Sequence, residues 1–263
     1  MKHLLFTGLL LGSLMPVPAV SQSALDGTWK IDLSKAKMPT KPDEFLLQDG
    51  TYHCKTCIPP IDIKADGQDQ PVTGHPYYDS MAIQIVDDHT IQETDKKAGK
   101  VVANSKVTVS PDGKSSVFEF SDSSATNGDP VTGKGTATRV AGGPAGSHAV
   151  SGSWRTTSLD NMSDNGLNFT YKLEGDSLNM TTPTGQSYTA KLDGTEAPYT
   201  GDPGTTSVSV KKIGSNAIEE TDKRDGKVIS VSVNTVQPDG KTMKIAVEDK
   251  LHGTTLSFVA VKQ

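Results

Sequence analysis

The feature of this sequence that most constrains its fold is an internal duplication. The segment Glu93–Lys100 (ETDKKAGK) recurs as Glu220–Lys227 (ETDKRDGK), an offset of 127 residues (220 − 93). Three further pairs of segments align at the same offset: Lys64–Gly67 with Lys191–Gly194, Thr73–Pro76 with Thr200–Pro203, and Pro111–Lys114 with Pro238–Lys241. Four matches in one register predict two copies of a single structural unit.

Both copies show the alternation of apolar and polar residues that is typical of half-buried β-strands. Alternation is clear over 81–85 in the first copy and over 229–233 in the second. Turn signals such as the Pro-Asp-Gly at 111–113 follow at intervals of about 8–12 residues. The sequence therefore predicts an all-β protein of two tandem antiparallel meander repeats, each of about eight strands. These would form two barrels or one pseudo-twofold β structure.

The division of the chain follows from the duplication. The first β repeat is predicted to span 24–141 and the second 151–263. Residues 142–150 contain Gly-Gly-Pro, which suits either a flexible joint between two domains or a hairpin loop within a shared sheet. We expect the two halves to pack against each other.

Residues 1–21 are predicted to be a signal peptide. Basic residues precede an apolar run over 4–15, and small residues follow, which is the order of a secretory signal. Small residues at positions 19 and 21 suit cleavage between Ser21 and Gln22, with a cut before Ala24 as the alternative. Neither this run nor any later stretch reaches the roughly 20 apolar residues of a membrane-spanning helix. The sequence predicts a periplasmic or secreted protein without membrane insertion.

Composition and charge exclude one class of partner. The chain is 34% hydrophobic and carries a formal net charge of −5, and its basic residues are spread singly. Nucleic-acid-binding proteins concentrate Lys and Arg in a patch or stripe. We therefore expect no nucleic acid partner.

The motif Gly-x-Trp opens both repeats, at Trp29 and at Trp154. These openings resemble the start of lipocalin-like barrels, in which the tryptophan packs at the closed end. The resemblance implies a barrel-end role for both tryptophans. It implies the same for Arg139, on the last predicted strand of the first repeat, where that superfamily often stacks an Arg over the Trp. The second repeat has Val259 or Lys262 near that place.

A second resemblance covers almost the whole chain after the signal segment. It rests on four motifs: IKADG (63–67), PVTGHPYYD (71–79), GQSYTAK (185–191) and EETDKRDGK (219–227). These are similar to a family of exported bacterial tandem-repeat β proteins that usually carries no named function. The resemblance implies export and β architecture, and it brings no catalytic residues.

Residues found in one copy only are candidates for a specific site, because shared residues belong to the common scaffold. The first copy alone carries His53, Cys54, Cys57, His75, Tyr77 and Tyr78. In an oxidising compartment the two cysteines are predicted to form a disulfide. The two histidines and two tyrosines form a candidate binding rim.

Two chemical alternatives involve the same residues. Cys-x-x-Cys is the spacing of thiol–disulfide exchange proteins, but their reactive thiol depends on a helix N-terminus, which a strand and a Pro-Pro loop do not offer. His53, Cys54, Cys57 and His75 would suit Zn²⁺ or Cu⁺, but oxidation of the cysteines removes the thiolate ligands. We therefore expect neither a metal nor a cofactor.

The acidic residues shared by the two copies are interpreted as scaffold. Glu93 and Asp95, like Glu220 and Asp222, share one strand face just before a Gly turn. Paired carboxylates can perform acid–base chemistry or bind Ca²⁺. No Asp-rich ligand loop follows either pair, however, and a lysine stands beside each. The pattern favours solvated strand ends.

The chain has no Gly-x-Ser-x-Gly nucleophile motif and no Gly-rich phosphate loop that opens a helix. The sequence therefore points to no catalytic residue. We expect an exported, non-enzymatic β protein of the cell envelope that binds a small ligand or an envelope component. A thiol–disulfide redox protein using Cys54 and Cys57 is one alternative. A structural or stress-protective protein without a ligand is the other.

Overall fold

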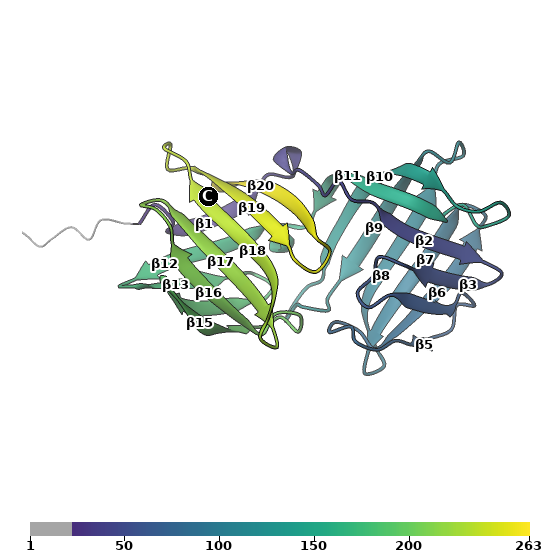
Figure 1. Cartoon of the computed structure of the whole chain (residues 1–263), viewed down its shortest axis with the longest axis horizontal. Coiled ribbons are helices and arrows are strands. Elements are labelled where there is room, and N and C mark those ends of the chain that lie inside the picture. The colour runs from purple at the N-terminus through teal and green to yellow at the C-terminus, as the bar shows by residue number, and fades with distance from the viewer. Residues whose placement is uncertain (1–22) are drawn as a thin grey trace, which may run out of the picture.

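The fold is all-β, as the sequence predicts: two ten-stranded antiparallel barrel-like sheets lie side by side (Figure 1). The computed structural model describes residues 23–263, so the predicted signal peptide at 1–21 lies outside the described residues. Within 23–263 the helical segments are two short 3₁₀ helices, η1 (Leu33–Lys35) and η2 (Asp164–Gly166). The described part contains no helix long and apolar enough to cross a membrane.

Barrel 1 is a ten-stranded sheet with the order β4-β3-β2-β11-β10-β9-β8-β7-β6-β5. Its strands are β2 (Asp43–Gln48), β3 (Thr51–Cys54), β4 (Ile61–Lys64), β5 (Gln70–Pro71), β6 (Ser80–Asp87), β7 (Thr90–Lys97), β8 (Lys100–Val109), β9 (Ser115–Asp122), β10 (Val131–Gly142) and β11 (Gly152–Met162). The edges of the sheet are β4 and β5.

Barrel 2 is closed and runs from β1 through β12 to β20. Its strands are β1 (Gly27–Ile31), β12 (Asn168–Glu174), β13 (Ser177–Thr181), β14 (Ser187–Lys191), β15 (Asp193–Thr200), β16 (Ser207–Lys212), β17 (Ala217–Arg224), β18 (Lys227–Val236), β19 (Thr242–Asp249) and β20 (Thr254–Lys262). Each sheet has ten strands instead of the predicted eight or so. Tight turns divide some stretches that the alternation of apolar and polar residues predicts as a single strand. Asp49 and Gly50, both with positive φ, separate β2 from β3 in this way.

The two barrels exchange their first strands. β1, from the first repeat, pairs with β12 and β20 in barrel 2. β11, its counterpart in the second repeat, pairs with β2 and β10 in barrel 1. The repeats 24–141 and 151–263 are therefore not the same units as the barrels. The segment 142–150 comprises the last residue of β10 and most of the loop of the β10–β11 hairpin. Both exchanged strands open with Gly-x-Trp and bury the tryptophan.

Each exchanged strand brings its tryptophan into the core of the other repeat's barrel. The side chains of Trp29 and Trp154 are buried, and each indole Nε1 donates to a backbone carbonyl four residues earlier at 2.8 Å. The guanidinium of Arg139 lies 4.1 Å from the centroid of the Trp154 ring, and Lys262 Nζ lies 4.8 Å from that of Trp29. Arg139 therefore stacks over a tryptophan, but over the one that the second repeat supplies.

Candidate functional site

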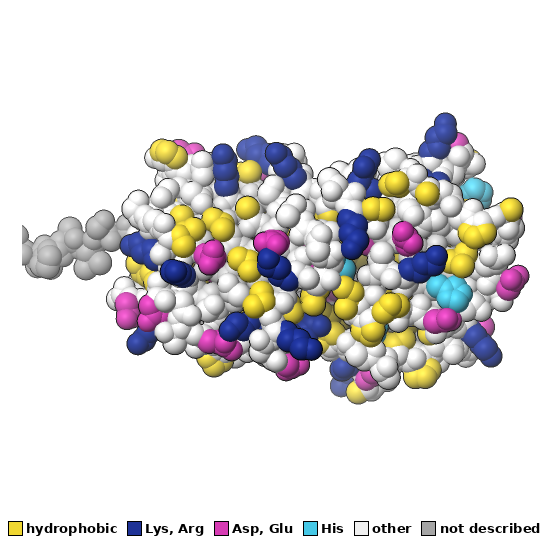
Figure 2. Space-filling model, viewed as in Figure 1, with side chains coloured by type: hydrophobic (Ala, Val, Ile, Leu, Met, Phe, Trp, Pro, Cys, Tyr) yellow, Lys and Arg dark blue, Asp and Glu magenta, His cyan; other side chains and the backbone are white. Residues whose placement is uncertain are grey.

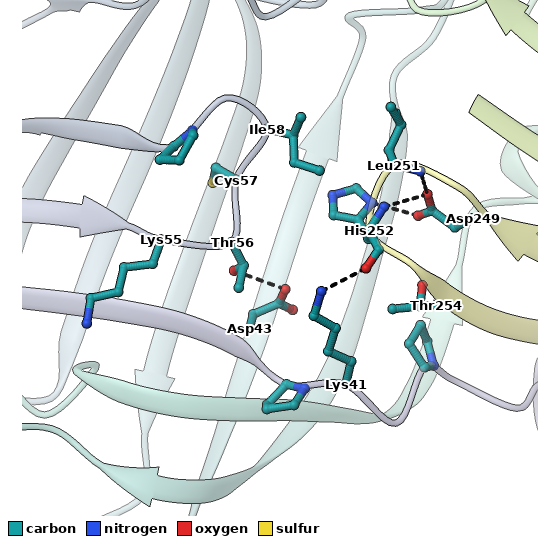
Figure 3. A pocket seen from close by; sticks show the side chains of 13 residues that line it. Lys41, Asp43, Lys55, Thr56, Cys57, Ile58, Asp249, Leu251, His252 and Thr254 are labelled. Atoms are coloured by element: carbon teal, nitrogen blue, oxygen red, sulfur yellow. Dashed lines mark hydrogen bonds and ion pairs between the residues drawn. The ribbon is translucent and has the colours of Figure 1, made fainter. Parts of the chain in front are cut away.

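A cleft of about 450 Å³ lies between the barrels and is drawn in Figure 3. Its polar side chains already interact with one another. His252 Nδ1 lies 2.6 Å from Asp249 Oδ2, Lys41 Nζ donates to the His252 carbonyl at 2.8 Å, and Thr56 donates to Asp43 Oδ1 at 3.3 Å. Since these groups are satisfied, the cleft presents little that would select a ligand. The face shown in Figure 2 likewise mixes basic and acidic side chains without a continuous patch of either sign.

A smaller cavity, of about 280 Å³, lies inside barrel 1. Aromatic and aliphatic side chains make most of its wall, among them Phe45, Tyr52, Ile91, Val107, Phe118 and Trp154. Its charged lining residues are Glu93 and Asp43. Asp43 also lines the cleft, so the cavity and the cleft adjoin there. A mostly apolar cavity with few polar groups is the usual form of a small-molecule site.

Close packing against glycine shapes one wall of this cavity. A Cβ on Gly135 of β10 would lie 2.3 Å from Cζ of Phe118, which stands opposite it on β9. The absence of a side chain at Gly135 therefore lets the Phe118 ring lie across β10. In barrel 2 the corresponding register pair is Ile245 of β19 with Phe258 of β20, so the aromatic side chain comes from β20 there.

The acidic residues of β7 point into barrel 1. Glu93 and Asp95 are in phase with Ile91, which is buried, and the side chain of Asp95 is only 6% exposed. In barrel 2 Glu220 is 8% exposed. The interpretation of these residues as solvated strand ends is therefore wrong. Alternation with a buried isoleucine, rather than the neighbouring lysine, decides which face they occupy.

In barrel 2 the carboxylate of Glu220 is fully hydrogen-bonded. Tyr171 OH donates to Oε2 at 2.5 Å and Tyr188 OH donates to Oε1 at 2.6 Å, while Asn234 Nδ2 also donates to Oε2. Ser230 OH donates to Asp222 at 2.7 Å. Four donors therefore surround this acidic pair, and the three on Glu220 are themselves buried.

Barrel 1 keeps the acidic pair but lacks all four donors. The strand registers give the corresponding residues as Phe45 for Tyr171, Ile61 for Tyr188, Val107 for Asn234 and Ala103 for Ser230. Within 23–263 no other residue donates a hydrogen bond to the carboxyl of Glu93 or Asp95, and Asp95 Oδ1 is buried without a partner. Buried polar groups are nearly always paired. Among the described residues, Asp95 Oδ1 shares this exception with His89 Nδ1 and with Asn234 Oδ1 of barrel 2.

Burial acts on the protonation of the acidic residues in both barrels. Burial raises the pKa of Glu93, and burial together with the neighbouring Glu93 carboxyl raises the pKa of Asp95 to about 8. Burial also raises the pKa of Glu220, to about 7, against the opposite effect of its hydrogen bonds to Tyr171 and Tyr188. The acidic pair of barrel 1 therefore holds a proton near neutral pH.

These raised pKa values predict that the protein is less stable at alkaline than at mildly acidic pH. An unfolded Asp or Glu has a pKa of about 4. Between pH 4 and 8 the folded state therefore binds more protons than the unfolded state, so the free energy of unfolding falls as the pH rises. We expect the Tm measured by calorimetry to be lower at pH 9 than at pH 5.5 by roughly 5 °C. Asp95→Asn should reduce this difference, and a Tm that stays level or rises with pH would contradict the prediction.

The predicted binding rim does not surround the cavity. His53 lies on the outer face of β3, with Nδ1 3.2 Å from Asp62 Oδ2. His75 stacks on Tyr78 with ring centroids 4.8 Å apart. Tyr77 OH donates to Asp202 Oδ1 at 3.0 Å and so joins the two barrels. Tyr77 and Tyr78 line a separate hollow, together with Asp95.

The predicted disulfide between Cys54 and Cys57 is confirmed. Cys54 is 2% exposed within the core of barrel 1, and Cys57 lines the cleft. Within the described residues, no group of three or more His, Cys, Asp or Glu side chains is placed to hold a metal ion. His53 and His75 are not gathered with the cysteines into such a group.

Comparisons of the chain with protein-family models and with curated proteins found no match. The resemblance to an exported tandem-repeat family therefore stays a prediction. The candidate site rests on the two barrels themselves, which provide an internal comparison of one acidic pair in two settings.

Proposed function

We propose that this protein is an exported, non-enzymatic β protein of the cell envelope that binds a small molecule inside barrel 1. One observation carries the proposal: Glu93 faces an apolar cavity of about 280 Å³ without a donor from outside the acidic pair, whereas its counterpart Glu220 is enclosed by three donors. The glutamate carboxyl at this position is thus paired with neighbouring side chains in barrel 2 and lacks them in barrel 1.

The cavity and the acidic pair of barrel 1 favour a ligand-binding role over a purely structural one. A cavity and an unpaired buried carboxyl both lower the stability of the folded state. Barrel 2 shows that this scaffold accepts a tyrosine, tyrosine and asparagine set that removes the second cost. A ligand that occupies barrel 1 would supply the missing contacts.

Binding can be tested by native mass spectrometry of protein purified from its host and by titration with N-phenyl-1-naphthylamine, a neutral fluorescent probe. We expect one bound molecule per chain. Ser105 lines the cavity, so Ser105→Phe should weaken probe binding by about tenfold or more, which is about 1.4 kcal/mol.

The matched control is Lys106→Phe, which adds the same ring to the exposed, outer face of β8. This variant should bind the probe as the wild-type protein does. Failure to detect a bound species or probe binding would overturn the proposal, and so would wild-type affinity in Ser105→Phe.

A further inference from the structure

We propose that the ligand of barrel 1 carries a cationic group, such as a protonated amine, that binds at Glu93 and Asp95. The inference rests on the proposed function and specifies the chemical class of the ligand. Its apolar part would occupy the cavity, and its cation would lie at the acidic side of the barrel.

The first support is the consistent loss of donors around a retained acidic pair. Barrel 1 has Phe45, Ile61, Val107 and Ala103 where barrel 2 has four donors. If the carboxyls had no partner of their own, burying them would cost free energy with nothing in return. A donor that arrives with the ligand accounts for both carboxyls being present.

The second support is Asp95 itself. Its side chain is 94% buried, it lies on the inward face of β7, and its Oδ1 has no hydrogen-bond partner. Asp95 is not one of the residues that line the cavity. It lines the neighbouring hollow together with Tyr78. An ammonium group has three donors, which is enough to reach more than one carboxylate oxygen.

The third support is the sign of the surrounding charge. The charged residues that line the cavity are Asp43 and Glu93, and those of the neighbouring hollow are Asp95, Asp122 and Asp202. Neither lining includes a Lys, Arg or His. The ionised carboxyls among these five would repel an anionic ligand and attract a cation.

The aromatic wall is compatible with the same class of ligand. Tyr52 and Phe118 line the cavity, and aromatic faces attract cations as well as apolar groups. An aryl or alkyl amine therefore matches both parts of the site. Such a ligand combines a hydrophobic body with one positively charged end.

The test compares three probes of nearly the same shape: 1-naphthylmethylamine, 1-naphthalenemethanol and 1-naphthoate. Affinities are measured by isothermal titration calorimetry with the purified protein at pH 8. We expect the amine to bind at least about tenfold more tightly than the alcohol, and the carboxylate to bind most weakly. In the double variant Glu93→Gln, Asp95→Asn the ratio of amine to alcohol affinity should fall to about one.

Glu119→Gln is the matched control, because it removes a carboxylate from the outer face of barrel 1. This variant should leave the ratio of amine to alcohol affinity unchanged. Equal affinity of the wild-type protein for amine and alcohol would overturn this inference and leave the proposed function standing. If none of the three probes binds, the proposed function fails and this inference fails with it.

Discussion

Replacing Glu220 by leucine is expected to destabilise the protein by about 3–5 kcal/mol, because it leaves three buried donors without their acceptor. Tyr171, Tyr188 and Asn234 all donate to this carboxyl and are 3–4% exposed. Water cannot replace the lost acceptor without entering the core of barrel 2. Glu220→Gln keeps one oxygen acceptor, so its cost should be smaller.

The same change in barrel 1 should have the opposite sign. Outside the acidic pair no residue donates to Glu93, so Glu93→Leu removes a buried carboxyl and leaves only the carboxyl of Asp95 without its partner. We expect no loss of stability, and a gain of about 1 kcal/mol at pH 8, where the ionised form is the more costly to bury.

Both variants can be compared by urea denaturation at pH 8. The exchanged strands β1 and β11 tie the barrels together, since neither barrel can unfold without releasing a strand that belongs to the other half. We therefore expect a single transition, for which free energies of unfolding are well defined. Equal losses of stability in Glu220→Leu and Glu93→Leu would show that the two carboxyls have similar surroundings, contrary to the structure.

Periodicity is sufficient to predict the all-β architecture but not the exchange of strands. Alternation indicates which face of a strand is buried, and it places Trp29 and Trp154 inward in the same way. This alternation would turn each tryptophan inward whether or not the strands are exchanged. Which barrel each strand joins depends on the path of the connections at 32–42 and 163–167, where no periodic pattern exists.

The sequence does not reveal the acidic site as long as residues shared by the two copies are assigned to the scaffold. Glu93 and Glu220 are indeed shared, but the two carboxyls differ in the residues around them. The signal that could have found the pair is its phase, since Glu93 and Asp95 alternate with Gln92 and Thr94 and follow the buried Ile91. The missing donors come from strands far apart in sequence. Their correspondence appears only once the pairing registers are known.

Transferring the four donors of barrel 2 into barrel 1 is expected to weaken ligand binding strongly. The variant carries four substitutions: Phe45→Tyr, Ile61→Tyr, Val107→Asn and Ala103→Ser. These should enclose Glu93 as Glu220 is enclosed and fill part of the cavity. We expect affinity for the naphthyl amine to fall by roughly 100-fold, which is about 2.7 kcal/mol. The free energy of unfolding should rise, because the buried carboxyls gain partners. Lower affinity together with higher stability excludes misfolding as the cause of the loss.

The reverse set in barrel 2 supplies the control: Tyr171→Phe, Tyr188→Ile, Asn234→Val and Ser230→Ala. It removes the donors of Glu220 and Asp222 and reduces the volume of side chains around them. We expect lower stability and a second amine site, so that calorimetry reports a stoichiometry of two instead of one. If the four substitutions in barrel 1 leave amine affinity unchanged, the acidic pair is not where the ligand binds. If the reverse set creates a second amine site, the absence of protein donors around the acidic pair is what allows one of two similar barrels to bind the ligand.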